Sequence, residues 1–203
     1  MTTISETYKA QQKSLHQNEK YGVASVSFAP LIIDIMARTK FRSVSDYGAG
    51  KCRLKQELSR QIAKFDYFPF DPAFPEYGKP QPAELVVCVD VLEHIEPAYL
   101  DTVISELASI TQCVGFFSIH TGPAKKLLSD GRNAHLIQQT ASWWLERLLP
   151  SFDVIQLTPL KKGFWVLVQR KGSNYSGYFE RKKDDLVFTQ KLLRRIKRLI
   201  KPL

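Results

Sequence analysis

Residues 43–52 read SVSDYGAGKC, and this stretch decides the fold. Its first five residues predict a short strand, and the glycines after them let the backbone turn tightly and approach a ligand closely. A helix that follows such a turn presents unpaired N–H groups to polar ligand atoms. An ordinary strand-to-helix turn looks the same, and a dinucleotide turn would need a glycine where Arg53 stands. The stretch therefore predicts a strand–turn–helix unit and leaves its ligand open.

Similar units continue along the chain. Apolar runs typical of strands buried on both faces occupy residues 84–90 and 113–120, and residues 67–71 form a shorter candidate strand. Helices are expected at residues 29–40, 54–63, 97–111 and 141–149, and an antiparallel strand pair at 152–157 and 164–170. This alternation predicts an α/β protein with a Rossmann-like, mostly parallel sheet, helices on both faces and a C-terminal antiparallel strand pair.

Only twelve residues, 72–83, connect the second predicted strand to the third. A helix, a further edge strand and a return loop do not fit into so short a segment, because a single crossover already takes about a dozen residues. We therefore expect one edge strand, the strand beside residues 67–71, to be missing from the sheet.

Three acidic residues stand at the ends of predicted strands. Asp46 precedes the glycine turn, Asp71 ends the second strand, and Asp90 ends the third. The carboxyl ends of strands in an open α/β sheet share the edge where ligands bind. A carboxylate at Asp46 can face a cationic amino group, and one at Asp71 can accept hydrogen bonds from ribose hydroxyls. We expect the three acids to converge on one ligand.

With these motifs, residues 20–170 resemble the class I S-adenosylmethionine-dependent methyltransferases, and DVLEHI, residues 90–95, is the most family-specific piece. The resemblance implies S-adenosylmethionine as the cofactor. It implies a cofactor site formed by Asp46, Gly48, Gly50, Asp71, Asp90, Val91 and Leu92. It also implies a cap over the cofactor around Tyr21 and Gly22, with help from Tyr8 and His16.

Two features depart from the family pattern. The family's third glycine is Cys52 here, which is small enough to be tolerated. The acid that often follows the missing edge strand and contacts adenine is absent, so we expect Pro75, Tyr77 or Cys88 to contact adenine instead.

The loop at residues 121–139 is the predicted acceptor site, because in the family this loop lies beside the cofactor's methyl group. We predict His135 as the general base and Arg132 as the anchor of an anionic or polyhydroxylated acceptor. Further acceptor contacts are expected from His120, Asn133 and Trp143.

Simpler interpretations of the same residues stay open. Asp130-Gly131 can form a plain turn with His135 capping the next helix, and His94 can serve helix packing beneath the site. Trp143 and Trp144 can both belong to the core. No metal is predicted, although some relatives use a carboxylate–histidine pair with magnesium, which Glu93, His94, His120 and His135 could supply.

The charge of the chain is unevenly spread. Of the net charge of +9, a share of +7 falls on residues 171–203, which hold ten Lys/Arg and three Asp/Glu. The body is therefore nearly neutral, and nucleic-acid binding by it is disfavoured. Three well-separated cysteines and an N-terminus without an apolar core favour a cytoplasmic protein.

Two parts are expected: a methyltransferase domain at residues 1–170, and a linker with a basic amphipathic helix at 171–203. Residues 184–203 suit the surface of an anionic membrane, with docking on the protein itself or RNA binding as alternatives. The predicted activity is O-methylation of a small-molecule, glycan or lipid-linked sugar acceptor. An RNA-modifying methyltransferase and a non-catalytic module that binds S-adenosylmethionine are the alternatives.

Overall fold

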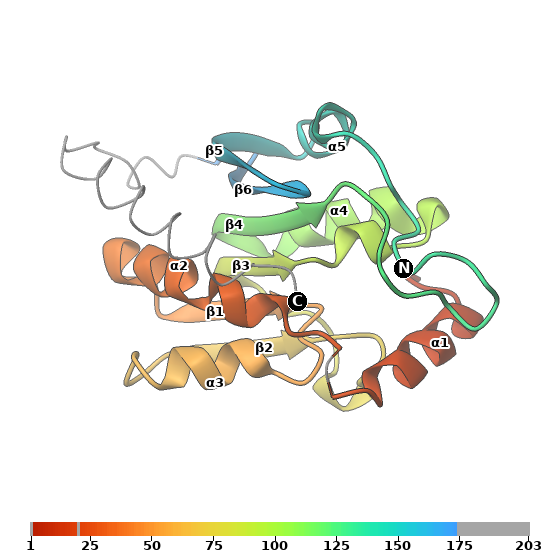
Figure 1. Cartoon of the computed structure of the whole chain (residues 1–203). Coiled ribbons are helices and arrows are strands. Elements are labelled where there is room, and N and C mark those ends of the chain that lie inside the picture. The colour runs from red at the N-terminus through yellow and green to blue at the C-terminus, as the bar shows by residue number, and fades with distance from the viewer. Residues whose placement is uncertain (1, 20, 174–203) are drawn as a thin grey trace.

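The computed structural model describes residues 2–19 and 21–173. Within these residues, six strands form one sheet in the order β2-β1-β3-β4-β6-β5 (Figure 1). The first four strands pair in parallel, and β6 runs antiparallel to both of its neighbours. The strands are β1 (Ser43–Tyr47), β2 (Asp66–Phe70), β3 (Ala83–Val89), β4 (Thr111–His120), β5 (Phe152–Leu160) and β6 (Gly163–Arg170). This confirms the predicted Rossmann-like α/β fold with a C-terminal antiparallel pair.

Helices cover both faces of the sheet, as predicted. Side chains of β3 alternate between the faces: Leu85 and Val87 point to one apolar cluster, and Val86 points to the other. The helices packed in the first cluster are α2 (Ala24–Thr39) and α3 (Arg53–Ser59), and those in the second are α4 (Leu100–Ile110) and α5 (Ala141–Leu148). The core therefore consists of two layers that hold the strand ends in fixed positions.

Some predicted helix bounds were wrong. The helix α2 begins at Ala24 instead of residue 29, and α3 ends at Ser59 instead of residue 63. Leu54 and Leu58 are fully buried, whereas Ile62 is only half-buried, so the apolar stripe of α3 ends with Leu58.

The strand β2 is an edge of the sheet, which agrees with the expected loss of a neighbouring strand. The connection from β2 to β3 holds only a short 3-10 turn, Pro75–Tyr77. The N–H of Asp66 donates to Arg42 O and therefore points toward β1. Because the backbone nitrogens of a strand point alternately to its two sides, the nitrogen of Pro69 points away from β1, toward the free edge. Because proline has no N–H there, the free edge offers one donor fewer to another strand.

Helix α1 (Glu6–His16) lies beyond the carboxyl ends of the parallel strands, next to the loop at residues 121–139 (Figure 1). Tyr8 of this helix packs with Leu128 and Ala134 of the loop in a small third apolar cluster. The helix and the loop thus form one cap over the strand ends.

The predicted basic helix at residues 184–203 and most of the linker before it lie outside the described residues. No helix in the described part of the chain is long and apolar enough to cross a membrane. The membrane contact therefore stays a prediction.

Candidate functional site

The ends of β1, β2 and β3 meet at one cavity of about 290 Å³. Asp46, Asp71 and Asp90 all line it, together with the glycine turn. The other side is closed by Tyr8, Gln12 and His16 of α1, and by Tyr21 and Gly22 just after that helix. Asp46, Asp71 and Asp90 therefore line one cavity, and their contacts with a cofactor stay a prediction.

The glycine turn is packed tightly against the end of β3. Gly48 has a φ of +82°, and a Cβ placed on it would lie 2.3 Å from Cγ2 of Val91. The N–H groups of Gly48 and Ala49 both donate to Phe70 O, which ties the turn to the end of β2. A side chain at Gly48 would be strained and would clash, so this position requires glycine.

The position of the family's third glycine also has a left-handed backbone. Cys52 has a φ of +52° and immediately precedes α3. A residue other than glycine pays a conformational cost in this region, since its Cβ crowds the following carbonyl. The substitution of glycine by Cys52 is thus tolerated with strain.

Asp71 holds the walls of the cavity together. Its carboxylate accepts hydrogen bonds from the N–H of Gly50, at 3.0 Å, and from that of Ala73, at 2.8 Å. The imidazole Nε2 of His16 lies 3.8 Å from the same carboxylate. Burial raises the pKa of Asp71, while the Ala73 N–H acts in the opposite direction. The carboxylate is therefore fixed by backbone donors and still faces the cavity.

Asp46 is almost completely buried at the end of β1. The hydroxyl of Tyr67, on the neighbouring strand β2, donates a hydrogen bond to its carboxylate. Burial raises the pKa of Asp46 to about 7, and the Tyr67 hydrogen bond limits this rise. The charge of Asp46 thus changes close to neutral pH, where a cationic ligand would favour the ionised form.

The end of β3 carries the third acid on an unusual backbone. Asp90 has a φ of +50°, and its Oδ1 accepts a 2.7 Å hydrogen bond from Ser118 Oγ on β4. Val91 lines the cavity as predicted. Leu92 does not line it: its side chain is fully buried in the core beneath, because the 3-10 turn Leu92–His94 directs it inward. The predicted cofactor contact of Leu92 does not fit this placement.

The adenine contacts suggested by the sequence do not fit either. Cys88 is fully buried in the core. Pro75 and Tyr77 are not among the residues that line the cavity, and the Tyr77 hydroxyl donates to Gly50 O. Pro72 and Ala73, which directly follow the acid at the end of β2, line the cavity in their place.

Two histidines of the cap side reach the cavity, one from the predicted loop and one from the DVLEH turn. His135 Nδ1 lies 2.7 Å from Gly122 O, and His94 Nδ1 lies 2.7 Å from Ala134 O. A carbonyl oxygen only accepts, so each Nδ1 must carry the proton and each Nε2 must carry the lone pair of a neutral ring. Burial lowers the pKa of both imidazoles, that of His94 to about 3.

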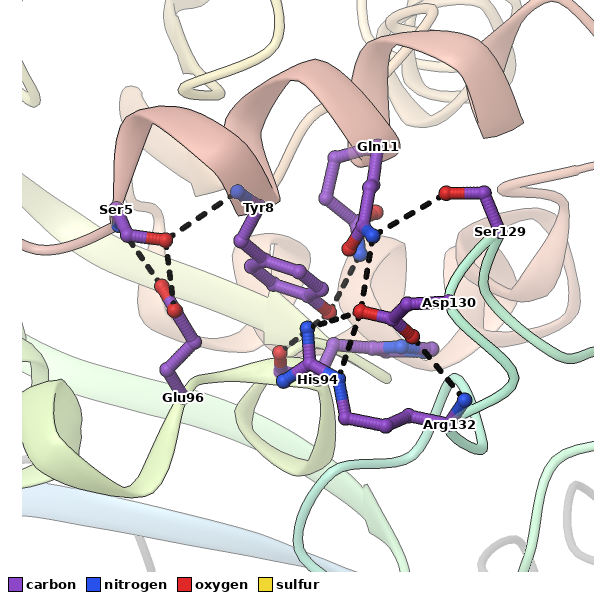
Figure 2. Close-up of polar contacts among 9 residues, drawn as sticks. Ser5, Tyr8, Gln11, His94, Glu96, Ser129, Asp130 and Arg132 are labelled. Carbon is purple, nitrogen blue, oxygen red and sulfur yellow. Dashed lines mark hydrogen bonds and ion pairs between the residues drawn. The ribbon is translucent and has the colours of Figure 1, made fainter.

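The remaining residues predicted for the acceptor lie outside the cavity lining. The exposed Arg132 forms an ion pair of 2.7 Å with Asp130 on the surface of the loop (Figure 2). The side-chain oxygen of Asn133 accepts a hydrogen bond from the N–H of Ala124, and its amide nitrogen donates one to Ala124 O. Both side chains therefore shape the loop, and the predicted role of Arg132 as an anchor does not fit its position.

His120 and Trp143 are also set back from the cavity. The Nδ1 of His120 lies within hydrogen-bond distance of both the O and the N–H of Gly122. Trp143 packs against the core and under the guanidinium of Arg147, 4.9 Å from the ring centroid. Trp144 is fully buried in the core, so the simpler interpretation, in which both tryptophans serve the core, fits the structure.

The turn at Asp130-Gly131 is present, but His135 does not cap the next helix. Gly131 N donates to Leu128 O across the turn. The N-cap of α5 is Thr140, whose side chain accepts from Trp143 N. Among the described residues, no group of three or more His, Cys, Asp or Glu side chains could hold a metal ion.

Gln12 and Ser118 were missed by the sequence analysis. Gln12 lines the cavity and accepts a hydrogen bond from the Tyr21 hydroxyl. It lies four residues from both Tyr8 and His16, so a helical spacing across residues 8, 12 and 16 could have revealed it. For Ser118 the sequence holds no comparable signal, since only strand pairing brings it to Asp90.

Comparison with known proteins supports the fold. No protein family and no characterised protein sequence matches the chain. An O-methyltransferase family protein from Burkholderia thailandensis matches with a TM-score of 0.60 at 10% identity, over 85% of this chain and 65% of its own length. The 1,6-didemethyltoxoflavin-N1-methyltransferase of the same organism, solved with S-adenosylhomocysteine, matches with a TM-score of 0.59 at 14% identity, over 84% of this chain and 92% of its own length. Human N-acetylserotonin methyltransferase, in complex with S-adenosylmethionine, matches with a TM-score of 0.55 at 15% identity, over 81% of this chain and 57% of its own length.

These likenesses show that the chain has the fold of class I methyltransferases. The chain spans just under two thirds of the first of these proteins and more of the second.

Proposed function

We propose that this chain is an S-adenosylmethionine-dependent methyltransferase that methylates a hydroxyl of a small acceptor. The observation that carries the proposal is the cavity itself, where three acids from three strand ends face one space beside a glycine turn. The methyltransferases of the same fold that were solved with S-adenosylmethionine or S-adenosylhomocysteine support the choice of ligand.

The residues of the cavity fit this cofactor. Gly48 and Gly50 line the cavity without side chains, so their backbone can lie close to a ligand, while Val91 packs against Gly48. Asp46 would hold the cationic amino group, and Asp71 would accept hydrogen bonds from the ribose hydroxyls. The bound cofactor supplies an electrophilic methyl group on a sulfonium.

We assign His135 as the general base. Its Nδ1 proton is committed to Gly122 O, so Nε2 is free to accept the proton of an acceptor hydroxyl. Burial lowers the pKa of His135, which keeps the ring neutral and able to accept a proton at neutral pH. The backbone contact also fixes the ring relative to the cavity, so that the base is positioned before the acceptor arrives.

Calorimetry with S-adenosylhomocysteine tests the cofactor site. The parent protein is expected to bind, and Asp71→Asn to bind about 10- to 100-fold more weakly, because a hydrogen bond to a charged group contributes about 1.5–3 kcal/mol. Asp66→Asn is the matched control, since Asp66 is exposed at the other end of the same strand. Thermal melting of each variant checks that the fold persists.

Two results would overturn the proposal. The first is a parent protein that gives no heat with S-adenosylhomocysteine at millimolar concentration. The second is equal affinity of the parent and a folded Asp71→Asn variant, which would remove the acid from the site.

A further inference from the structure

One half of the cavity is left over once the cofactor residues are assigned. It lies between α1 and the turn Leu92–His94, and is lined by Ile4, Tyr8, His94, Ile95 and His135. The hydroxyl of Tyr8 is committed, because it donates to His94 O at 2.7 Å. The two imidazoles are therefore the groups of this half that can recognise a polar ligand.

The two rings form a fixed pair. Their centroids lie 4.7 Å apart and their planes are nearly perpendicular, at 85°. Both Nδ1 protons are used by backbone carbonyls, and neither Nε2 has a hydrogen-bond partner within the described part of the chain. The pair thus offers two hydrogen-bond acceptors and no donor to the cavity, as long as both rings are neutral.

Hydrogen bonds from α1 and from the loop at residues 121–139 hold His94 in place. Figure 2 shows Tyr8 reaching from α1 to the backbone of His94. The start of the same helix is attached to Glu96, which accepts hydrogen bonds from the N–H and the hydroxyl of Ser5. Since Ala134 O holds the ring from the loop side, the Nε2 of His94 cannot swing away without breaking the cap.

The electrostatics of the cavity disfavour an anionic acceptor. Asp90 lines it. No Lys or Arg is among the described residues that line the cavity. A carboxylate or phosphate group would therefore meet no cationic Lys or Arg side chain and would lie near Asp90, which is unfavourable in a partly buried site.

We propose that His94 determines the acceptor specificity of this site: together with His135, it selects a neutral acceptor that presents two adjacent hydrogen-bond donors. This inference rests on the proposed methyltransferase function. One donor is the hydroxyl that loses its proton to His135, and the other donates to Nε2 of His94. His94 itself removes no proton, because burial lowers its pKa to about 3 and makes it a weak base.

Three single-ring probes test the proposal: catechol, with two adjacent hydroxyls; phenol, with one; and 3,4-dihydroxybenzoate, which adds an anionic group. Methyl transfer from S-adenosylmethionine to each is measured by mass spectrometry, and kcat and KM are determined separately. The parent is expected to prefer catechol to phenol by about tenfold in kcat/KM, the value of one good hydrogen bond, and to use the benzoate least.

Variants at position 94 isolate the second contact. His94→Ala is expected to abolish the preference for catechol, mainly by raising the KM for catechol toward that for phenol. His94→Gln retains an acceptor at the end of a side chain of similar length and should restore part of the preference. Imidazole NMR signals give a reading without turnover: catechol should shift those of both His94 and His135, with and without S-adenosylhomocysteine.

An unchanged catechol-to-phenol ratio in a folded His94→Ala variant would overturn the proposal, as would a preference for the benzoate. Catechol that shifts neither histidine signal would also do so. Failure of the proposed function shows differently, since it appears as the absence of S-adenosylhomocysteine binding whatever the probes do.

Discussion

The contact between the glycine turn and the end of β3 can be measured, because the chain contains a matched pair of glycines. Gly48 has a φ of +82° and a Cβ built on it would lie 2.3 Å and 3.1 Å from the two methyl carbons of Val91. Gly131 has nearly the same φ, +84°, but a Cβ there meets nothing within 4 Å. Alanine at Gly131 therefore reports the cost of the backbone alone, and alanine at Gly48 reports that cost plus the clash.

The expected magnitudes follow from these contacts. Gly131→Ala should lower the free energy of unfolding by about 1–2 kcal/mol, the cost of a left-handed backbone. Gly48→Ala should add about 1–3 kcal/mol for overpacking against Val91. The gain from a less flexible unfolded chain applies to both substitutions and cancels in the comparison.

A double-mutant cycle with Val91→Ala separates the two terms. Urea unfolding is measured for the parent, for Gly48→Ala, for Val91→Ala and for the double variant. The four free energies of unfolding should give a favourable coupling energy of about 1–3 kcal/mol between the two positions. The backbone cost remains in the double variant, so its stability recovers only in part. If Gly48→Ala is no more destabilising than Gly131→Ala, or if the coupling is zero, the turn does not pack against β3 as described and the argument for a shared cavity fails.

Three further predictions follow from individual residues. The cavity acid Asp46 has its pKa raised to about 7 by burial, so its stabilising effect on the free protein is full at low pH and is lost as the pH rises through 7. Binding of cationic S-adenosylmethionine needs the ionised form, so calorimetry should show about tenfold tighter binding at pH 8 than at pH 6, and Asp46→Asn should remove this dependence. In thermal melts, Cys52→Gly should raise the melting temperature by relieving the left-handed backbone, whereas a β-branched residue in Cys52→Val should lower it. Arg132→Ala should leave S-adenosylhomocysteine affinity and acceptor KM within about twofold, because the exposed Arg132–Asp130 pair lies outside the cavity lining; a large rise in KM would restore Arg132 as an acceptor anchor.

The half of the cavity at the ends of the parallel strands could be predicted because its residues are tied to those strand ends. A buried strand is a local pattern, and the parallel sheet brings the carboxyl ends of neighbouring strands to one edge. Asp46, Asp71 and Asp90 follow this rule, and so does the short connection that leaves β2 at the edge. Leu92 fails because the strand has already ended, and the 3-10 turn that follows no longer alternates its side chains between two faces.

The acceptor half could be predicted only in part, because a loop has no fixed period. His135 and Arg132 stand three residues apart in the loop, yet one faces the cavity and the other pairs with its own neighbour in the turn. Nothing in the sequence distinguishes them, since Arg132 is turned by its contact with Asp130 and the ring of His135 by its contact with Gly122 O. His94 was expected beneath the site, and the cap contact to Ala134 O is what orients its ring at the cavity.

The charge of the whole protein and the charge of its cavity point to opposite kinds of ligand. The chain carries +9, of which +7 falls on residues 171–203, while the cavity is lined by Asp46, Asp71 and Asp90. Screening limits the reach of exposed charges to about 10 Å in ordinary salt, whereas buried groups are screened far less. The carboxylates that line the cavity therefore favour a cationic ligand there. Because Asp46 titrates near neutrality, the same cavity also loses part of this attraction in mildly acidic solution.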